Sequence, residues 1–216
     1  MLTQPSTTSI VDTLVARYPE LLPLTTRLTQ AADMICACHQ RDGLVLICGN
    51  GGSAADSAHI VGELMKGFML PRTPNAAQHA CLTAAGCPDG LQRGVRAIDL
   101  TAQIALLLAV ANDLSVDSTF AQQVFAYGRP GDVLVVLSTS GNARNVVRAA
   151  QTAQALGLQT IGFTGIQGGD VAPYCNLLLN VPATETYLVQ ELHLPLYHAL
   201  CAMVETKLFG DEVPSC

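Results

Sequence analysis

The chain has 216 residues, of which 50% are hydrophobic and 13% are charged, and these proportions predict one globular α/β domain with a large core. The net charge is −6 and Lys and Arg form no cluster, so we expect neither a nucleic acid nor an anionic membrane surface as a partner. The low charge fraction also predicts additional buried surface, as in an oligomer.

The N-terminal region reads as helical. The first ten residues contain neither a basic region nor an apolar stretch, so we expect no secretory signal. Residues 7–40 show helical periodicity that Pro19 and Pro23 interrupt, which predicts a helical hairpin: a short helix, a bend, and a longer helix to about Gln40. The longest apolar run, residues 104–111, is too short to span a bilayer.

Residues 44–66 are the most informative stretch of the chain. An apolar run over 44–47 predicts a buried strand, which a turn and then a helix from about Ser53 follow. The turn consists of Asn50, Gly51 and Gly52, and two adjacent glycines allow the backbone to approach a ligand closely. We expect Ser53 and Asp56 to form a capping box. The free N–H groups at this helix start favour an anion such as phosphate.

The same predicted helix carries an imidazole and a carboxylate. His59 and Glu63 stand at positions i and i+4, so they share one face of the helix. A glycine turn and a single His–Glu pair also occur in purely structural settings, and the stretch taken alone favours that interpretation. It matches neither the dinucleotide-binding pattern nor a Walker loop.

Residues 70–94 are rich in Pro and Gly and lack a clear periodicity. We predict an excursion with short helical turns that covers the mouth of a site. His79 lies in this excursion and is interpreted as a loop residue.

Strands and helices then alternate. We predict strands over 95–100, 132–137, 159–163 and 177–181, and helices over 101–111, 117–127, 142–156 and 187–208. Thr101 is expected to cap the first of these helices, and Asn112 and Asp113 close it. Pro195 lies inside the last helix, where we expect a kink or a restart. No linker or change of composition divides the chain, so a single domain over residues 1–216 is predicted.

Alternating strands and helices predict a parallel sheet with helices on both faces. Ligands of such sheets bind at the carboxyl ends of strands, and the turns at 50–53 and 138–141 both follow predicted strands. Ser138, Thr139 and Ser140 place three hydroxyls ahead of Gly141 and a helix start, which makes a phosphate cradle without cationic side chains. An N-cap with a tight turn is the alternative; the presence of two such turns favours phosphate.

The last predicted helix contributes further polar residues. Gln190 and His198 differ by eight positions, so they lie near one face, whereas His193 falls on another. A helix histidine is more often a partly buried structural residue. Together with His59 and Glu63, however, Gln190 and His198 make a four-ligand set for a divalent metal possible.

The chain has eight cysteines and no C-x-x-C pair: Cys36, Cys38, Cys48, Cys81, Cys87, Cys175, Cys201 and Cys216. Most lie in apolar segments, which favours buried reduced thiols over a disulfide or zinc framework. Reduced thiols in turn predict a cytoplasmic location.

Three separated motifs, GNGGSAADSAHIVGEL, STSGN and VQELHLPLYH, occur in this order. On these motifs the chain resembles sugar isomerase (SIS) domain proteins of the phosphoheptose isomerase type over about residues 30–208. The resemblance implies a flavodoxin-like three-layer sandwich, with N-terminal helices over 1–42 and an α/β core over 43–210. It also implies a homotetramer with sites between subunits.

The activity that the resemblance implies is the aldose–ketose isomerisation of sedoheptulose 7-phosphate to a glycero-manno-heptose 7-phosphate. The implied ligands of one zinc ion per subunit are His59, Glu63, Gln190 and His198, and the implied proton-transfer pair is Glu63 and His198. The implied substrate-binding residues are Asn50, Gly51, Gly52, Ser53, Glu63, Asn112, Asp113, Ser138, Thr139, Ser140 and Gln190.

Such chemistry has a physical basis. Moving a carbonyl from C2 to C1 requires a base for a carbon-bound proton and an acid for the oxygen, and a buried carboxylate with an imidazole can supply both through an enediol. Ala143 and residues 185–189 depart from the family pattern, and the 70–94 excursion is longer than in these isomerases. The alternatives are a non-catalytic SIS protein that binds the bacterial replication initiator, and a sugar-phosphate-sensing module.

Overall fold

The computed structural model describes residues 5–210 and contains one parallel sheet. Its strands are β1 (Val45–Gly49), β2 (Ala97–Asp99), β3 (Val133–Ser138), β4 (Gln159–Thr164) and β5 (Leu177–Asn180). They lie in the order β2–β1–β3–β4–β5, and every neighbouring pair is parallel. All residues of β1 and β3 are buried, as their continuous apolar runs predicted. This strand order is that of flavodoxin-like folds, so the predicted fold class is confirmed.

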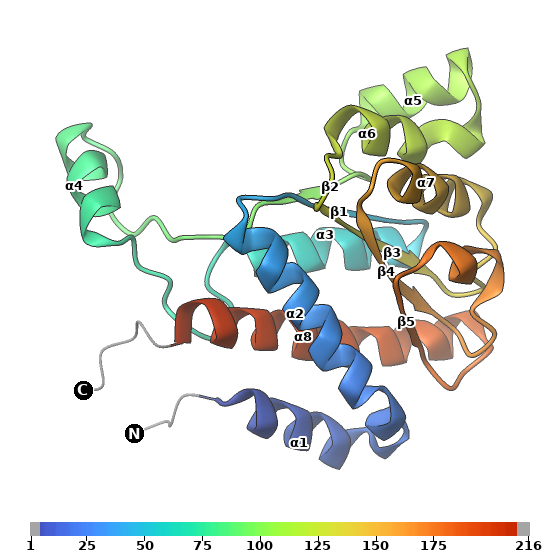
Figure 1. Cartoon of the computed structure of the whole chain (residues 1–216), viewed down its shortest axis with the longest axis horizontal. Helices are drawn as coiled ribbons and strands as arrows, with labels where there is room; N and C mark the ends of the chain where they lie inside the picture. The colour runs from blue at the N-terminus through green and yellow to red at the C-terminus, as the bar shows by residue number, and fades with distance from the viewer. Residues whose placement is uncertain (1–4, 211–216) are drawn as a thin grey trace.

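Helices cover both faces of the sheet (Figure 1). On one face lie α2 (Thr25–Gln40), α3 (Gly52–Met65) and α8 (Thr186–Phe209), with α1 (Thr7–Arg17) packed outside α8. On the other face lie α5 (Ile104–Asp113), α6 (Thr119–Tyr127) and α7 (Arg144–Ala155). Alternate residues of β1 face opposite layers, since Val45 and Ile47 join one core cluster and Leu46 and Cys48 the other. Three short 3₁₀ turns complete the described elements: Pro19–Leu24, Val116–Ser118 and Gly169–Tyr174.

The predicted order of a short helix, a bend and a longer helix is confirmed, but α1 packs on α8 rather than along α2, so the two do not form a packed hairpin. A 3₁₀ turn that contains Pro19 and Pro23 separates α1 from α2, because proline interrupts the α-helical hydrogen-bond pattern. Pro195 behaves differently: it lies inside α8, which is one continuous helix of 24 residues, so the predicted alternative of a restart there does not occur.

Two predicted helix caps are wrong. The N-cap of α3 is Gly51, with φ of 58°, and it makes no side-chain cap bond. Ser53 lies inside the helix and is buried, so it cannot cap it. Helix α5 begins at Ile104 rather than after Thr101, and the Thr101 hydroxyl donates to the Asp99 carboxylate instead.

The predicted excursion projects away from the rest of the chain (Figure 1). It carries α4 (Ala76–Ala84), which a capping box of Asn75 and Gln78 starts; His79 therefore lies in a helix, and the loop prediction for it is wrong. No residue of α4 is buried, so the predicted covering of a site within the same chain is also wrong. We call residues 73–93 the arm. Its two stems meet at the base, where the Arg93 N–H donates to the Arg72 carbonyl at 2.7 Å.

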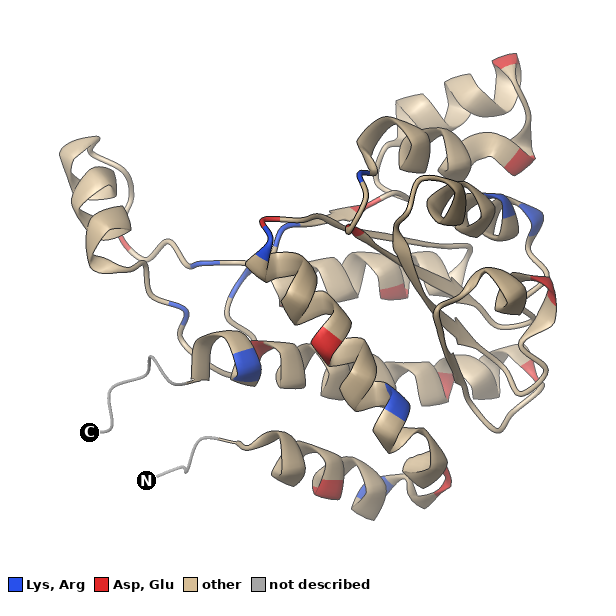
Figure 2. Ribbon diagram, viewed as in Figure 1, with Lys and Arg blue, Asp and Glu red and all other residues tan. Residues whose placement is uncertain are grey.

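The described cysteines form no disulfide, and the described charges are scattered over the chain (Figure 2). The seven described cysteines are free thiols, and Cys36, Cys38, Cys48 and Cys201 are buried; Cys216 lies outside the described residues. Charges of both signs are spread over the chain (Figure 2). Within residues 5–210 no helix has the length and apolarity needed to cross a membrane.

Candidate active site

The two glycine- or serine-rich turns lie side by side. Strands β1 and β3 are parallel neighbours, and Gly49 pairs with Leu137 at their carboxyl ends. The turn after each strand therefore starts at the same edge of the sheet, where ligands of such sheets bind. A pair of amides joins the turns: Asn50 Nδ2 donates to Asn145 Oδ1 at 2.8 Å, and Asn145 Nδ2 donates to Asn50 Oδ1 at 3.0 Å. Sequence reasoning missed Asn145, whose sequence signal was an amide in the first turn of α7.

A glycine-rich loop supports the second turn from behind. Gly141 has φ of 71°, and a Cβ there would overlap the Gly168 carbonyl oxygen, so glycine is required. The Asp170 N–H donates to Asn142 Oδ1 at 2.9 Å. Of the three predicted hydroxyl residues of this turn, Ser138 is buried, Thr139 is half-buried and Ser140 is exposed. Ser140 is therefore the one among them whose side chain is fully open to a ligand.

Three of the predicted chemical residues converge between α3 and α8. His59 Nε2 lies 3.1 Å from Glu63 Oε1 and 3.4 Å from His198 Nε2. The first pair follows from the i, i+4 spacing on α3, whereas the second depends on the packing of α3 against α8. The side chain of His59 is 42% exposed and that of Glu63 is 16% exposed, so the cluster can be reached from solvent at its edge.

A tyrosine and an aspartate lie behind His59. The Tyr197 hydroxyl is 3.0 Å from His59 Nδ1 and 3.2 Å from Asp56 Oδ1, and the tyrosine is fully buried. Burial raises the pKa of Tyr197 well above its usual value, and the Asp56 charge adds to this rise. Burial also raises the pKa of Asp56, against the lowering effect of the hydrogen bond from Tyr197. The phenol therefore keeps its proton and can act as a donor.

Burial also affects His198. Desolvation lowers its pKa, the neighbouring His59 lowers it further, and Glu63 opposes both. A neutral imidazole is thus favoured at this position, which leaves a ring nitrogen available to accept a proton or to bind a metal.

The other predicted residues lie elsewhere. Gln190 packs its amide against Gly52, where an added Cβ would approach Gln190 Nε2 to 2.6 Å. Gln190 is thus beside the first turn, and eight residues of helix, about 12 Å, separate its backbone from that of His198. Asn112 and Asp113 are exposed at the end of α5, on the opposite face of the sheet, where Asn112 Nδ2 donates to Asp113 Oδ1. Within residues 5–210, no hydrogen bond or ion pair joins Gln190, Asn112 or Asp113 to the His59 cluster.

The donor set of the cluster suits zinc. Tetrahedral Zn²⁺ at about 2.0–2.1 Å from its ligands separates neighbouring donor atoms by about 3.3 Å, close to the two distances from His59 Nε2. Glu63 Oε2 is buried without a partner, which leaves a carboxylate oxygen for a cation. No group of three His, Cys, Asp or Glu side chains in residues 5–210 is arranged to hold a metal as it stands. The residues therefore fit zinc in donor type and in two separations.

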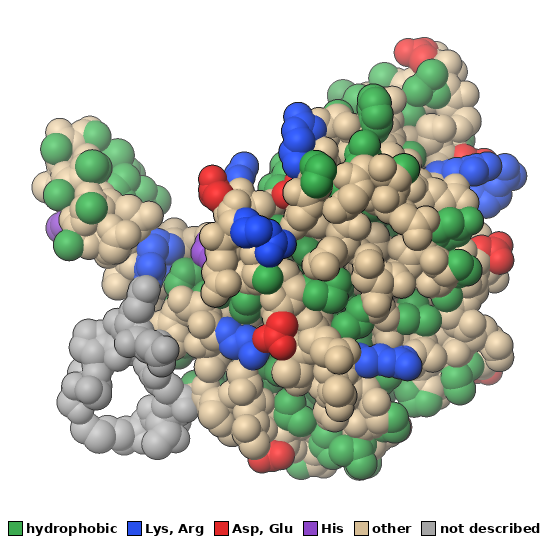
Figure 3. All heavy atoms as spheres, viewed as in Figure 1, with side chains coloured by type: hydrophobic (Ala, Val, Ile, Leu, Met, Phe, Trp, Pro, Cys, Tyr) green, Lys and Arg blue, Asp and Glu red, His purple; other side chains and the backbone are tan. Residues whose placement is uncertain are grey.

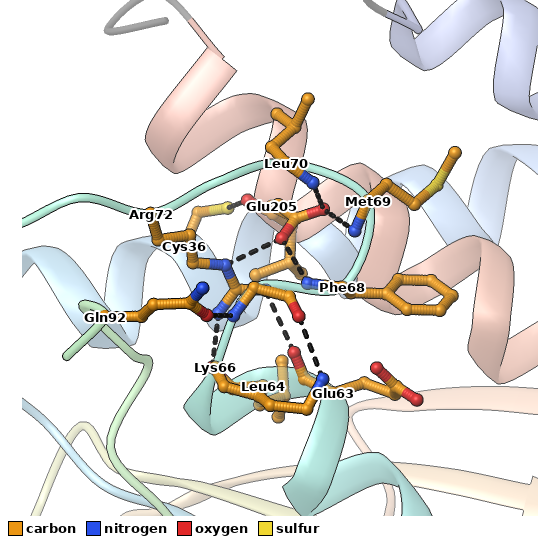
Figure 4. Close-up of polar contacts among 12 residues, drawn as sticks. Cys36, Glu63, Leu64, Lys66, Phe68, Met69, Leu70, Arg72, Gln92 and Glu205 are labelled. Atoms are coloured by element: carbon orange, nitrogen blue, oxygen red, sulfur yellow. Dashed lines mark hydrogen bonds and ion pairs between the residues drawn. The ribbon is translucent and has the colours of Figure 1, made fainter. Parts of the chain in front are cut away.

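A buried ion pair anchors the end of α3 (Figure 4). Glu205, on α8, accepts the Arg72 Nε–H at 2.7 Å and the backbone N–H groups of Phe68, Met69 and Leu70 at 2.7–3.0 Å. The Arg72 guanidinium also donates to the carbonyls of Glu63 and Leu64, which belong to the last turn of α3. This anchor caps the helix that carries His59 and Glu63. Sequence reasoning missed it.

An apolar groove of about 490 Å³ opens beside His198. Residues of α1 and α8 line it, together with Phe68 and Met69 from the segment after α3. The groove gives the cluster one apolar wall.

Comparisons with known proteins agree with this geometry. A family model described as the SIS domain matches residues 21–77 and 73–165. A phosphoheptose isomerase of Rhodospirillum rubrum is 39% identical over 181 residues, which cover 84% of this chain and 86% of the relative. A phosphoheptose isomerase of Clostridium acetobutylicum is 41% identical over 169 residues, 78% of this chain and 76% of the relative.

A solved structure of similar fold belongs to the same group. The phosphoheptose isomerase GmhA of Neisseria gonorrhoeae superposes with a TM-score of 0.72 at 34% identity, over 91% of this chain and 94% of that one. The family model covers β1 to β4, both turns and α3, and the solved structure extends the likeness to most of the chain. The chain therefore belongs to the SIS-domain family of phosphoheptose isomerases.

Proposed function

We propose that this protein is an aldose–ketose isomerase that converts sedoheptulose 7-phosphate to a glycero-manno-heptose 7-phosphate. One observation carries the proposal: the packing of α3 on α8 brings Glu63 and His198 around His59, in a chain that belongs to the phosphoheptose isomerases. A carboxylate and an imidazole at this spacing are the acid–base groups that such a reaction requires. The family membership favours an enzyme over a non-catalytic binding protein.

Glu63 and His198 have different proposed roles in the proton transfer. Glu63 takes the proton from the carbon next to the carbonyl, and His198 serves the oxygen, so that the carbonyl moves between C2 and C1 through an enediol. The position of the Glu63 carboxylate beside His59 and the lowered pKa of His198 support these roles, because a lowered pKa favours a neutral imidazole that can accept a proton.

The phosphate is proposed to bind at the two turns. Asn50, Gly51, Gly52 and Ser53 offer one helix start, and the hydroxyl residues Ser138, Thr139 and Ser140 lie on the adjacent turn. Their common position at the carboxyl ends of β1 and β3 supports this assignment. Gln190, packed on Gly52, is proposed to contact the substrate between the phosphate and the His59 cluster.

We further propose one zinc ion per subunit, held by His59, Glu63 and His198 with Gln190 as the fourth ligand. A metal there would polarise the substrate carbonyl and stabilise negative charge on its oxygen. The donor types and the two separations around His59 support three of these ligands, whereas Gln190 rests on the resemblance of the VQELHLPLYH motif.

A homotetramer in the cytoplasm is the proposed state. Exposed apolar side chains support an interface, among them Ile104 and Leu108 on α5, which are 67% and 66% exposed. Hydrophobic side chains also gather over the arm (Figure 3). Asn112 and Asp113, which lie away from the cluster in their own chain, would then contribute to a site shared with a neighbour. Light scattering at micromolar concentration tests this: a monomer would contradict both the tetramer and the shared site.

The deciding experiment assays metal-analysed protein against ketose phosphates of five to seven carbons, with solvent deuterium incorporation as a second readout. We expect turnover of the seven-carbon substrate, label at C1 or C2, and loss of activity after chelation. The Glu63→Gln variant is the control for a contaminating isomerase. Turnover of no ketose phosphate, combined with direct binding to a replication initiator, would favour the alternative function.

A further inference from the structure

Helix α4 receives little tertiary packing from its own chain. It has nine residues, begins at a capping box and ends where Gly86, with φ of 67°, turns the backbone; none of its residues is buried. Isolated helices shorter than about 12–15 residues are only marginally stable in water, and most helices in proteins depend on the packing of one face. The packing that α4 needs is therefore expected from outside the chain.

The base of the arm holds α4 in a defined direction (Figure 1). There the Arg93 N–H donates to the Arg72 carbonyl at 2.7 Å, and Arg93 Nε donates to the Thr73 carbonyl at 2.8 Å. The guanidinium carbons of Arg72 and Arg93 lie 4.9 Å and 5.1 Å from the ring centroid of Phe209, on α8. An element that is fixed in this way loses little conformational freedom when it docks, which favours binding.

The surface of the arm carries a single carboxylate. Between Thr73 and Gln92 the one Lys, Arg, Asp or Glu is Asp89, which is exposed and forms no ion pair within residues 5–210. Hydrophobic side chains gather over the arm (Figure 3), and Leu91 is exposed. A projecting apolar surface of this kind is typical of a contact with another protein.

The groove between α1 and α8 has complementary properties. Its volume is about 490 Å³, and Arg17 is the one Lys, Arg, Asp or Glu side chain among its lining residues. Arg17 forms no ion pair within the described part of the chain, and Met69 and Leu194 line the groove and are exposed. The groove thus combines uncovered apolar surface with one unpaired positive charge, whereas the arm offers one unpaired negative charge.

The groove and the base of the arm adjoin, because Phe68 and Met69 line the groove and Thr73 begins the arm. A twofold axis between them would seat each arm in the groove of the other protomer. A stable interface takes about 20–30 residues from each side; the arm has 21 residues, and 14 residues line the groove. A second copy is favoured over an unrelated protein, because this one chain supplies both halves of the contact.

We propose that the arm of one protomer docks in the groove between α1 and α8 of a second protomer, with Asp89 close to Arg17, and that the second arm docks in return. Because His198 lines this groove, the docked arm would close the open side of the His59 cluster. The inference rests on the proposed oligomer with a shared site, and it names the segment that completes that site.

The first test identifies what α4 contacts. An unlabelled chain with p-benzoylphenylalanine at the exposed position of Ala80 is mixed with ¹⁵N-labelled wild-type chain and irradiated after subunit exchange. We expect mass spectrometry to find mixed-label cross-links from residue 80 to α1 or to residues 194–202 of α8. Cross-links that stay within one chain, that lead to another surface such as α5, or that do not form at all would overturn the inference.

The second test reverses the two unpaired charges. In Asp89→Arg or Arg17→Glu, the protein concentration at which the α4 amides become protected from hydrogen exchange should rise about 10-fold, because like charges then meet in the contact. The double variant should return to the wild-type value. Both positions are exposed, so the fold is retained. Asp12→Arg reverses an exposed charge of α1 outside the groove, and this matched control should leave the protection unchanged. A double variant no better protected than the single variants would contradict the pairing.

The outcomes separate this inference from the proposed function. An active isomerase whose α4 amides exchange freely at every protein concentration, and whose probe does not reach the groove, overturns the inference alone. Cross-links into the groove of a protein that turns over no ketose phosphate support the inference and refute the proposed activity alone.

Discussion

Arg72 Nε lies 2.7 Å from Glu205 Oε1, and the two side chains are 0% and 1% exposed. This is a buried ion pair between α8 and the segment that follows α3, and it closes the helix that carries His59 and Glu63 (Figure 4). Because the carboxylate also accepts three backbone N–H groups, its charge is compensated from several directions. The pair is therefore important for the local geometry of the cluster as well as for stability.

Glu205→Gln should lower the free energy of unfolding by about 3–5 kcal/mol, because an amide nitrogen would face either Arg72 or a backbone donor. Urea denaturation followed by circular dichroism measures this. Lys207→Met is the control: Lys207 forms a more exposed pair with Asp33, and its loss should cost less than about 1 kcal/mol. If both variants lost the same free energy of unfolding, the buried pair would stabilise the fold no more than the exposed pair does.

Glu63→Gln should lower kcat by at least about 10²-fold, since the amide keeps the size of the side chain but cannot accept the proton. KM should change less, because the proposed phosphate anchor is intact. Steady-state kinetics with the seven-carbon ketose phosphate measure both constants. Glu191→Gln, at an exposed position of α8, should retain wild-type kinetics. A Glu63→Gln enzyme with normal turnover would remove Glu63 from the mechanism.

Ser140→Ala should raise KM for the phosphorylated sugar, because Ser140 is the exposed hydroxyl of the second turn. One hydrogen bond to a charged group is worth about 1.5–3 kcal/mol. The measurement compares binding of the phosphorylated and the free sugar in the wild type and the variant. If the substitution weakens both ligands equally, Ser140 does not contact the phosphate.

Stability should decrease with falling pH because of His193. The residue is fully buried, with Nε2 3.3 Å from the Thr164 carbonyl oxygen, and burial lowers its pKa to about 4. In the unfolded chain its pKa is about 6.5. Between these two pKa values the unfolded state binds a proton that the folded state excludes. The contribution of His193 to the free energy of unfolding is therefore fully present above pH 6.5, and it decreases by about 3 kcal/mol as the pH falls to about 4.

His193→Gln should abolish this part of the pH dependence, and urea denaturation at several pH values measures it. His79→Gln, on the exposed α4, should leave the pH dependence unchanged. An identical pH profile in His193→Gln and the wild type would show that His193 is not the titrating group.

The sheet could be predicted because its signals are local. Strands β1 and β3 are uninterrupted apolar runs, and a strand buried on both faces requires such a run. The helix caps were predicted less well than the strands. Ser53 and Thr101 have side chains suited to an N-cap, but α3 and α5 begin after Gly51 and Gln103 instead. At α3 the positive φ of Gly51 determines the start, and this is a property of the turn rather than of the capping pattern.

The cluster was partly predictable. The contact of His59 with Glu63 follows from helix geometry. The contact of His59 with His198, 139 positions away in the sequence, depends on how α3 and α8 pack together. The resemblance supplied that contact; spacing alone did not. Tyr197 and Glu205 were missed because their roles depend on long-range partners. Glu205 had one usable signal, since it is a charged residue that follows the apolar run 199–204 of α8.

The closed base of the arm has a consequence for how the chain tolerates change. The Arg93 N–H donates to the Arg72 carbonyl, so the two ends of the arm are held together where they join the rest of the fold. This contact does not depend on the length of the arm. Lengthening a loop whose ends are already held together costs little entropy, and none of the residues of α4 is buried. The turn between Gly86 and Gly90 is therefore a graft point at which an epitope or a fluorescent peptide can be inserted without loss of the sheet.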